Sequence, residues 1–217
     1  GIQTLAKGGA RVKLFPVGAK DASGGGDDAV LLPSSAADSS GTGELSLLMR
    51  MGSFSPRQSF QMRAYERDLL GEKEVPADAY YGVQTARGLE NFQLSGIPIN
   101  TYPGFVEAWA IVKLAAARAN TEVGAMKPER LAAIEKACQA VLDGKYHDQF
   151  KVDWYQGGAG TSTNMNANEV LANVGLELTG HKKGEYQFLE PHDDLNMSQS
   201  TNDSYPTAIK VALLMRH

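Results

Sequence analysis

The sequence predicts a mainly α fold, and three observations support this prediction. Apolar residues recur at helical spacing in four stretches between residue 104 and the last residue. Glycine or proline stands at the expected start or end of these stretches. The alternating pattern of a half-buried strand is scarce, and the sequence shows no internal repeat.

The composition of the chain changes near residue 63. Residues 1–62 contain no Tyr or Trp and carry clusters of Gly, Ser and Asp at 23–28 and 34–41. Such a segment buries too little apolar surface to offset its chain entropy, and its acidic residues do not suit a transit peptide. We therefore expect residues 1–62 to be a disordered or mis-assigned N-terminal extension. Residues 63–204 are expected to form a folded domain, and residues 205–217 to begin a further helix.

The folded part is expected to begin with an extended segment. Between residues 68 and 82, turn residues separate short apolar pieces, which favours extended chain on the surface of a helical body. The first helix is predicted over residues 104–123, because apolar residues share one helical face and Gly124 ends the pattern. That face is formed by Phe105, Trp109, Val112 and Ala116.

Three further helices follow in the sequence. The second has Pro128 in its first turn and ends at Gly144, and the third follows a glycine-rich loop and ends at Gly180. The fourth is predicted to begin near Pro206 and to continue to His217. Their apolar faces are Leu131, Ile134, Cys138 and Val141, then Ala167, Leu171, Val174 and Leu178, then Ile209, Ala212 and Leu213.

Composition also argues against several classes of function. The formal net charge is −4 and no long basic stripe occurs, so we expect no nucleic-acid partner. No apolar run approaches the roughly 18 residues of a membrane span. Cys138 is the single cysteine, which excludes an internal disulfide and fits a reducing compartment. These features predict a cytoplasmic protein.

Two polar segments stand directly before predicted helices. Residues 156–166 and 199–203 are rich in small residues, hydroxyls and amides. A helix N-terminus presents free backbone N–H groups, and its dipole favours an anion. We therefore predict a site for a small dicarboxylate that is bound by neutral donors. The segments have neither the Gly-Lys-Ser/Thr of a Walker loop nor the GxGxxG spacing of a dinucleotide site.

A purely structural interpretation of both segments is the alternative. Glycines before a helix often serve only a tight turn, and Thr or Asn beside them often serve only as caps. The second segment weakens this alternative, because a helix needs one cap. Ser200, Thr201, Asn202 and Asp203 offer four capping residues in a row.

Residues 157–173 and 200–203 resemble the first two active-site segments of the fumarase/aspartase superfamily, in the aspartase form rather than the fumarase form. Supporting matches lie at residues 80–85, 90–92 and 184–187. The resemblance covers about residues 66–217, the first third of an ordinary family member. It implies the N-terminal helical domain of that fold, truncated where the central helical bundle begins.

The resemblance also implies a chemistry and a set of site residues. Thr161, Ser200 and Thr201 would bind the β-carboxylate of L-aspartate, and Thr201 and Asn202 would lie near its amino group. The implied reaction is that of an aspartate ammonia-lyase, elimination of ammonia to give fumarate through an aci-carboxylate intermediate. The family implies a homotetramer, and no cofactor or metal is expected.

Two family segments have no counterpart in this sequence. These are the mobile loop that carries the catalytic serine base and the middle-helix segment that supplies another Thr and a His or Gln. No catalytic base is therefore expected in this chain, and the chain alone is expected to be inactive. One alternative is a fumarate hydratase of the same superfamily. Another is a non-catalytic fragment that only associates with full-length subunits.

The histidines do not indicate a metal site. His147 and His181 lie in turn-like stretches where surface roles are expected. Residues 190–194 are rich in potential ligands, but these are consecutive and lack metal-ligand spacing. His192 stands where fumarases carry the Asn of a secondary dicarboxylate site, so the resemblance does not extend to that site.

Overall fold

The computed structural model describes residues 5–6, 11–16, 60–68, 71–156 and 158–217. The chain divides into two units, residues 1–64 and residues 65–217. Four strands form one sheet in the order β1-β2-β3-β4, and both β1–β2 and β2–β3 are antiparallel. The strands are β1 (Leu5–Ala6), β2 (Arg11–Pro16), β3 (Phe60–Asp68) and β4 (Gly71–Pro76).

The predicted N-terminal extension falls mostly outside the described residues. Within residues 1–62 the structure describes β1, β2 and the start of β3, so the expectation of disorder stays a prediction for the remainder. The predicted domain boundaries likewise stay predictions. The extended segment expected over residues 68–82 contains β4.

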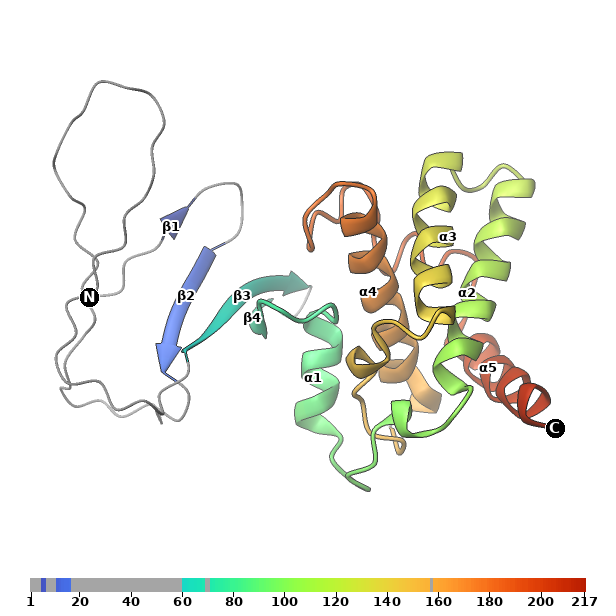
Figure 1. The fold of residues 1–217 in the computed structure, drawn as a ribbon, viewed down its shortest axis with the longest axis horizontal. Helices are drawn as coiled ribbons and strands as arrows, with labels where there is room; N and C mark the ends of the chain where they lie inside the picture. The colour runs from blue at the N-terminus through green and yellow to red at the C-terminus, as the bar shows by residue number, and fades with distance from the viewer. Residues whose placement is uncertain (1–4, 7–10, 17–59, 69–70, 157) are drawn as a thin grey trace, which may run out of the picture. The chain divides into compact units, whose positions relative to one another are not determined.

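Residues 65–217 are built mainly from helices, which confirms the predicted fold class (Figure 1). The α-helices are α1 (Val83–Asn91), α2 (Phe105–Glu122), α3 (Pro128–Leu142), α4 (Thr161–Leu178) and α5 (Thr201–Arg216). Three short 3-10 helices are η1 (Ile99–Thr101), η2 (His147–Gln149) and η3 (Gly158–Gly160). Among the described helices, none has the length and apolar character needed to cross a membrane.

Helix α4 lies at the centre of the helical unit. It packs against α3 on one side and α1 on another, while α2 contacts both α3 and α5 (Figure 1). Every residue of α4 from Asn166 to Leu176 is buried. The largest fully buried side chains around it come from several elements and include Trp109, Ile134, Phe150, Leu171 and Leu189.

Two helices differ from the sequence prediction. α1 was not predicted, and α5 begins at Thr201 rather than near Pro206. Proline favours the first helical position, which made Pro206 look like a start. In the structure Pro206 lies in the second turn, where its missing N–H leaves the carbonyl of Asn202 without its usual helical partner. The polar residues before it form the first turn.

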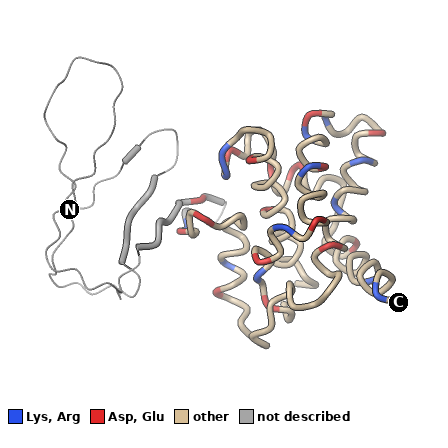
Figure 2. The backbone as a smooth tube through the Cα atoms, in the orientation of Figure 1, with Lys and Arg blue, Asp and Glu red and all other residues tan. Residues whose placement is uncertain are grey.

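Charged side chains of both signs are mixed over the helical unit (Figure 2). On α2, Glu107 and Glu122 lie on either side of Lys113 and Arg118, and no described helix carries a continuous basic stripe. Net charge on this unit is therefore distributed rather than gathered on one helix.

A buried carboxylate anchors the start of α1. Glu169 of α4 accepts hydrogen bonds from the backbone N–H groups of Gly82, Gln84 and Thr85 at 2.8, 2.7 and 3.0 Å. The free N–H groups and the dipole of a helix N-terminus favour an anion, and at this N-terminus the anion is the Glu169 carboxylate. A Cβ on Gly82 would lie 2.9 Å from the Glu169 carboxyl carbon, so a larger residue before the helix would displace this carboxylate.

A second carboxylate shares this helix N-terminus. Glu66 accepts from the N–H of Val83 at 3.1 Å and from the Tyr186 hydroxyl at 3.2 Å. Burial, and then the neighbouring charge of Glu169, raise the pKa of Glu66 to about 7. At neutral pH this carboxyl group is therefore close to its titration midpoint.

Replacing Glu66 by Gln is expected to remove part of the pH dependence of stability. The Glu66 pKa is 4.5 in the reference state and about 7 in the folded protein, so the folded state holds more protons between these values. The free energy of unfolding must then fall as pH rises through this window, by on the order of 2 kcal/mol for this group. Glu66→Gln should match the parent near pH 5 and exceed it in stability above pH 7, as measured by urea unfolding.

The exposed Glu122 provides the control. Glu122→Gln should leave the difference in stability between the two pH values unchanged. If Glu66→Gln lost stability between the two pH values as steeply as the parent, the assignment of a protonated Glu66 would be wrong.

Candidate active site

The first polar segment forms the N-terminus of α4. Gly160 is the residue before the helix, has φ +88°, and offers no side-chain cap, and no acidic residue lies in the first turn. No side chain of the described residues therefore caps the start of this helix. Thr161 is exposed, and its hydroxyl donates a hydrogen bond to the carbonyl of Gly158 at 2.7 Å. Gly157 lies outside the described residues.

The second polar segment forms the N-terminus of α5. Ser200 is the N-cap, and its Oγ accepts a hydrogen bond from the N–H of Asn202 at 3.2 Å. Ser200 therefore acts as a helix cap, as the purely structural interpretation of this segment predicts. Asn202 is exposed, and Thr201 is half-buried with its Oγ1 accepting from Asn164 Nδ2 at 3.1 Å.

The two helix N-termini lie against each other. Gly160 packs on the ring of Tyr205, and a Cβ at Gly160 would lie 2.6 Å from Tyr205 Cε2. Asn164 joins the same two helices, because it also accepts a hydrogen bond from the Ser204 hydroxyl at 3.3 Å. The structure thus brings the start of α4, with Thr161, next to the start of α5, which carries Ser200, Thr201 and Asn202.

Sequence analysis missed the polar cluster behind these N-termini. Lys113 of α2 is 1% exposed, and its Nζ lies 2.7 Å from Asn164 Oδ1 and 2.9 Å from Gln199 Oε1. Burial lowers the pKa of Lys113 to about 7. A signal was present, because Lys113 follows Trp109 by four residues and so belongs to the apolar face of the predicted helix.

Aromatic rings form the wall beneath the joined N-termini. Tyr205 packs edge-on against Phe105 at 6.3 Å between ring centroids, and lies 6.2 Å from the ring of Trp109. The same Trp109 ring lies 5.5 Å from the ammonium of Lys113. A ligand at the helix N-termini would therefore have neutral donors in front and a rigid apolar support behind.

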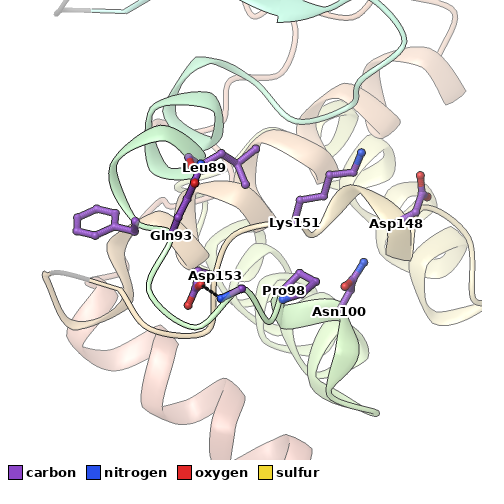
Figure 3. Close-up of a pocket in the computed structure, with 9 residues that line it drawn as sticks. Leu89, Gln93, Pro98, Asn100, Asp148, Lys151 and Asp153 are labelled. Atoms are coloured by element: carbon purple, nitrogen blue, oxygen red, sulfur yellow. Dashed lines mark hydrogen bonds between the residues drawn. The ribbon is translucent and has the colours of Figure 1, made fainter.

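A separate pocket of about 570 Å³ contains none of the four predicted site residues (Figure 3). It is lined by the end of α1 and two loops, through Leu89, Phe92, Gln93, Gly96, Pro98, Asn100, Asp148, Lys151 and Asp153. The carboxylate of Asp153 accepts from the backbone N–H groups of Ser95 and Gly96, both at 2.8 Å. Asp153 thus holds the loop in place.

One group of three potential metal ligands occurs among the described residues. The ligand atoms of Glu190, His192 and Asp193 lie within 4.8 Å of one another. His192 Nδ1 is 3.0 Å from the Asp193 carboxylate, and Glu190 also accepts a hydrogen bond from the Asp193 N–H. His192 and Asp193 are exposed, so their charges are already solvated. The prediction that no metal is needed stays a prediction.

Comparison with known proteins relates this geometry to a family. Residues 71–217 match the family model described as Lyase. The chain is 59% identical over 152 residues to an aspartate ammonia-lyase of Pseudomonas aeruginosa, covering 70% of this chain and 32% of that protein. The chain therefore spans about a third of the length of this relative.

Solved structures show the same relationship. A fumarate lyase:delta crystallin from Brucella melitensis in native form superposes with a TM-score of 0.68 and 54% identity, over 70% of this chain and 34% of that one. A recombinant class II fumarase from Schistosoma mansoni gives a TM-score of 0.64 and 36% identity, over 70% and 32%. The chain belongs to the fumarase/aspartase superfamily of lyases, as its two polar segments indicated.

Proposed function

We propose that this chain supplies substrate-binding groups of an aspartate ammonia-lyase, which converts L-aspartate to fumarate and ammonia. The observation that carries the proposal is the pair of helix N-termini joined at Gly160 and Tyr205. Both present neutral donors, and α4 has no side-chain cap of its own. The 59% identity to the Pseudomonas aeruginosa aspartate ammonia-lyase supports this choice of reaction, against 36% to the Schistosoma mansoni fumarase.

In this proposal Thr161, Ser200 and Thr201 bind the β-carboxylate, and Thr201 and Asn202 lie near the amino group. The hydrogen bonds support such roles for three of the four. Ser200 and Thr201 each accept a hydrogen bond through oxygen, so the hydroxyl hydrogen of each can donate to a ligand. The Asn202 amide makes no hydrogen bond within the described residues. The Thr161 hydroxyl must turn away from the Gly158 carbonyl before it can donate.

The chemistry accounts for neutral donors at this site. Removal of the Cβ proton by a base leaves its electron pair delocalised into the β-carboxylate, giving an aci-carboxylate with two negative charges. That electron pair then forms the Cα=Cβ double bond as the C–N bond breaks and ammonia leaves with the bonding electrons. Donors fixed around the carboxylate oxygens stabilise this intermediate more than the substrate. No residue of this chain is assigned as the base.

The same proposal extends to assembly and location. We propose that the whole enzyme is a cytoplasmic homotetramer, as the family resemblance implies. Leu213, Leu214 and Met215 on α5 are 66, 78 and 48% exposed, and contiguous apolar exposure of this kind often marks a contact surface. Cys138, buried and unpaired, is consistent with a reducing compartment.

The first prediction from this proposed function is that the 217-residue chain has no lyase activity alone. The matched residues make up 32% of the Pseudomonas aeruginosa relative, and the family's base-carrying loop has no counterpart here. Purified chain should leave L-aspartate unchanged when fumarate is followed by its ultraviolet absorbance. Sustained fumarate production above that of a mock purification from the same host would contradict this.

Activity is tested in a chimera, in which residues 71–217 replace the matching segment of the Pseudomonas aeruginosa relative. The chimera should form fumarate from L-aspartate and should add ammonia, rather than water, to fumarate. Hydration of fumarate without ammonia addition would favour the fumarate hydratase alternative. A chimera that assembles but catalyses neither reaction would favour a chain whose only role is association.

A second prediction separates substrate donors from helix caps. In the chimera, Asn202→Ala should reduce turnover about a hundredfold, as loss of a donor to a developing oxyanion does. Its melting temperature should not change, because the Asn202 side chain holds no other group. Ser200→Ala should reduce turnover and also cost about 1 kcal/mol of stability, because it removes the cap of α5.

Thr207→Ala, on an exposed position of the same helix, is the matched control. It should change neither turnover nor melting temperature. Full turnover in Asn202→Ala and in Ser200→Ala, with stability lost only in the latter, would leave Ser200 as a helix cap and would contradict a donor role for both residues.

A further inference from the structure

Lys113 is a buried cation that is surrounded by amides rather than carboxylates. Its ammonium donates to Asn164 Oδ1 at 2.7 Å, Gln199 Oε1 at 2.9 Å and Asn196 Oδ1 at 3.3 Å. Within the described part of the chain it forms no ion pair. An ammonium has three donors and no acceptor, so these three neutral oxygens satisfy all of its hydrogen bonds. Its charge, however, remains uncompensated.

The ammonium decides which way the Asn164 side chain faces. The amide has an acceptor oxygen and a donor NH₂ group. The oxygen must face Lys113, because the NH₂ group and the ammonium are both donors and cannot bond each other. The NH₂ group must then face the other way. There it donates to Thr201 Oγ1 at 3.1 Å and to Asn196 Oδ1 at 2.9 Å. Asn164 is 1% exposed, so water cannot supply hydrogen bonds to its amide in the reversed orientation.

The Thr201 hydroxyl is thereby fixed in its role. Its oxygen accepts from Asn164, and this is its one hydrogen bond within the described residues. Its hydrogen therefore has no acceptor among the described residues and can be donated to a ligand on the exposed side. If the Asn164 amide were reversed, its oxygen would accept the Thr201 hydroxyl hydrogen. That hydrogen would then not be available to a ligand.

We infer that Lys113 is a positioning residue that, through the Asn164 amide, makes the Thr201 hydroxyl a donor to the substrate carboxylate. This inference rests on the proposed function and deepens it. Lys113 does not touch the substrate in this account. It determines the polarity of a hydrogen-bond chain from α2 through α4 to the start of α5. Its positive charge also lies behind Thr201, whose hydroxyl would bind the carboxylate on which negative charge develops.

The titration of Lys113 provides an independent signature. Burial lowers its pKa to about 7, and the neighbouring titratable group, Cys138 of α3, has its thiol pKa raised by burial to about 12 and stays neutral. Between about pH 7 and pH 10 the unfolded chain holds more protons at this lysine, so stability rises with pH. Loss of the ammonium as the pH rises through about 7 should weaken the fixed orientation of Asn164. Stability and turnover should therefore move in opposite directions.

Asn164→Asp is the sharpest test in the chimera. The substitution is isosteric and gives Lys113 a counter-ion, so stability should be retained or increased. A carboxylate offers Thr201 only acceptors, which draws the hydroxyl hydrogen inward and away from the substrate. The value of kcat should fall at least about a hundredfold, with a smaller change in KM, because the lost donor acts mainly on the intermediate.

Asn166→Asp is the matched control. Asn166 is a buried asparagine on the same helix, but it bonds the backbone of Gln149 and Lys151 at 3.1 and 3.0 Å rather than an ammonium. The added charge should lower the melting temperature and leave kcat of the folded enzyme within about threefold. The two asparagines thus predict opposite patterns. Turnover of Asn164→Asp within threefold of the parent, or equal losses in both variants, would overturn the inference.

NMR on the 217-residue chain tests the orientation without any activity. Asn164 side-chain NH₂ resonances should show NOEs to Thr201 in the parent, and these should weaken or be replaced in Lys113→Met. Unchanged NOEs in Lys113→Met would overturn the inference, because the lysine would not be what fixes the amide. A parent chimera without ammonia-lyase activity would instead contradict the proposed function, and the NMR result would then decide the inference alone.

Discussion

Burying α4 on nearly all sides brings polar side chains into the core, and most of them have a partner there; Thr163 Oγ1 and Asn168 Oδ1 have none among the described residues. Glu169 takes the backbone N–H groups at the start of α1, and Asn173 donates to the carbonyl of Tyr80 and accepts from the N–H of Gly184. Asn164 takes Lys113 and Thr201. An unpaired buried amide or carboxylate costs several times the net value of one hydrogen bond. These hydrogen bonds to α4 therefore fix the positions of the segments around it.

The same helix shows how this protein handles carboxylates. At the start of α1, three N–H groups hold the Glu169 carboxylate at 2.7 to 3.0 Å. The start of α4 has no acidic residue in its first turn and no side-chain cap. The start of α1 thus holds an internal anion, whereas the start of α4 is the site that we propose for an external one. Lys113 lies behind the second N-terminus and brings a positive charge that no described carboxylate neutralises.

The sequence predicted α2, α3 and α4 well, because their apolar residues keep helical spacing and Gly or Pro marks their ends. It failed for α1, which begins after Gly82 and depends on a carboxylate contributed from 87 residues away. It also placed the start of α5 too late, because Pro206 looked like a first-turn proline. A long-range partner, which no local pattern encodes, decided the start of α1. The start of α5 was decided by the local cap Ser200, which the sequence does carry.

The site was predictable to a similar degree. The two polar segments were visible in the sequence as helix N-termini rich in hydroxyls and amides. The choice of Thr161, Ser200, Thr201 and Asn202 within them came from the family resemblance and stays a prediction. The contact of Gly160 with Tyr205, which joins the two N-termini, depends on tertiary packing. The network of Lys113 was visible only as a charged residue on an apolar face. Its three amide partners lie 51 to 86 residues further along the chain.

The central claim is that the starts of α4 and α5 together bind one dicarboxylate. A crystal structure of the chimera with bound succinate, an unreactive dicarboxylate of the same length as fumarate, tests it most directly. The account predicts one carboxylate with its oxygens about 2.7–3.2 Å from Thr201 Oγ1 and from donors at the start of α4, and Asn164 still facing Lys113 through its oxygen. Succinate bound only elsewhere, for example in the pocket beside Asp153, would contradict it.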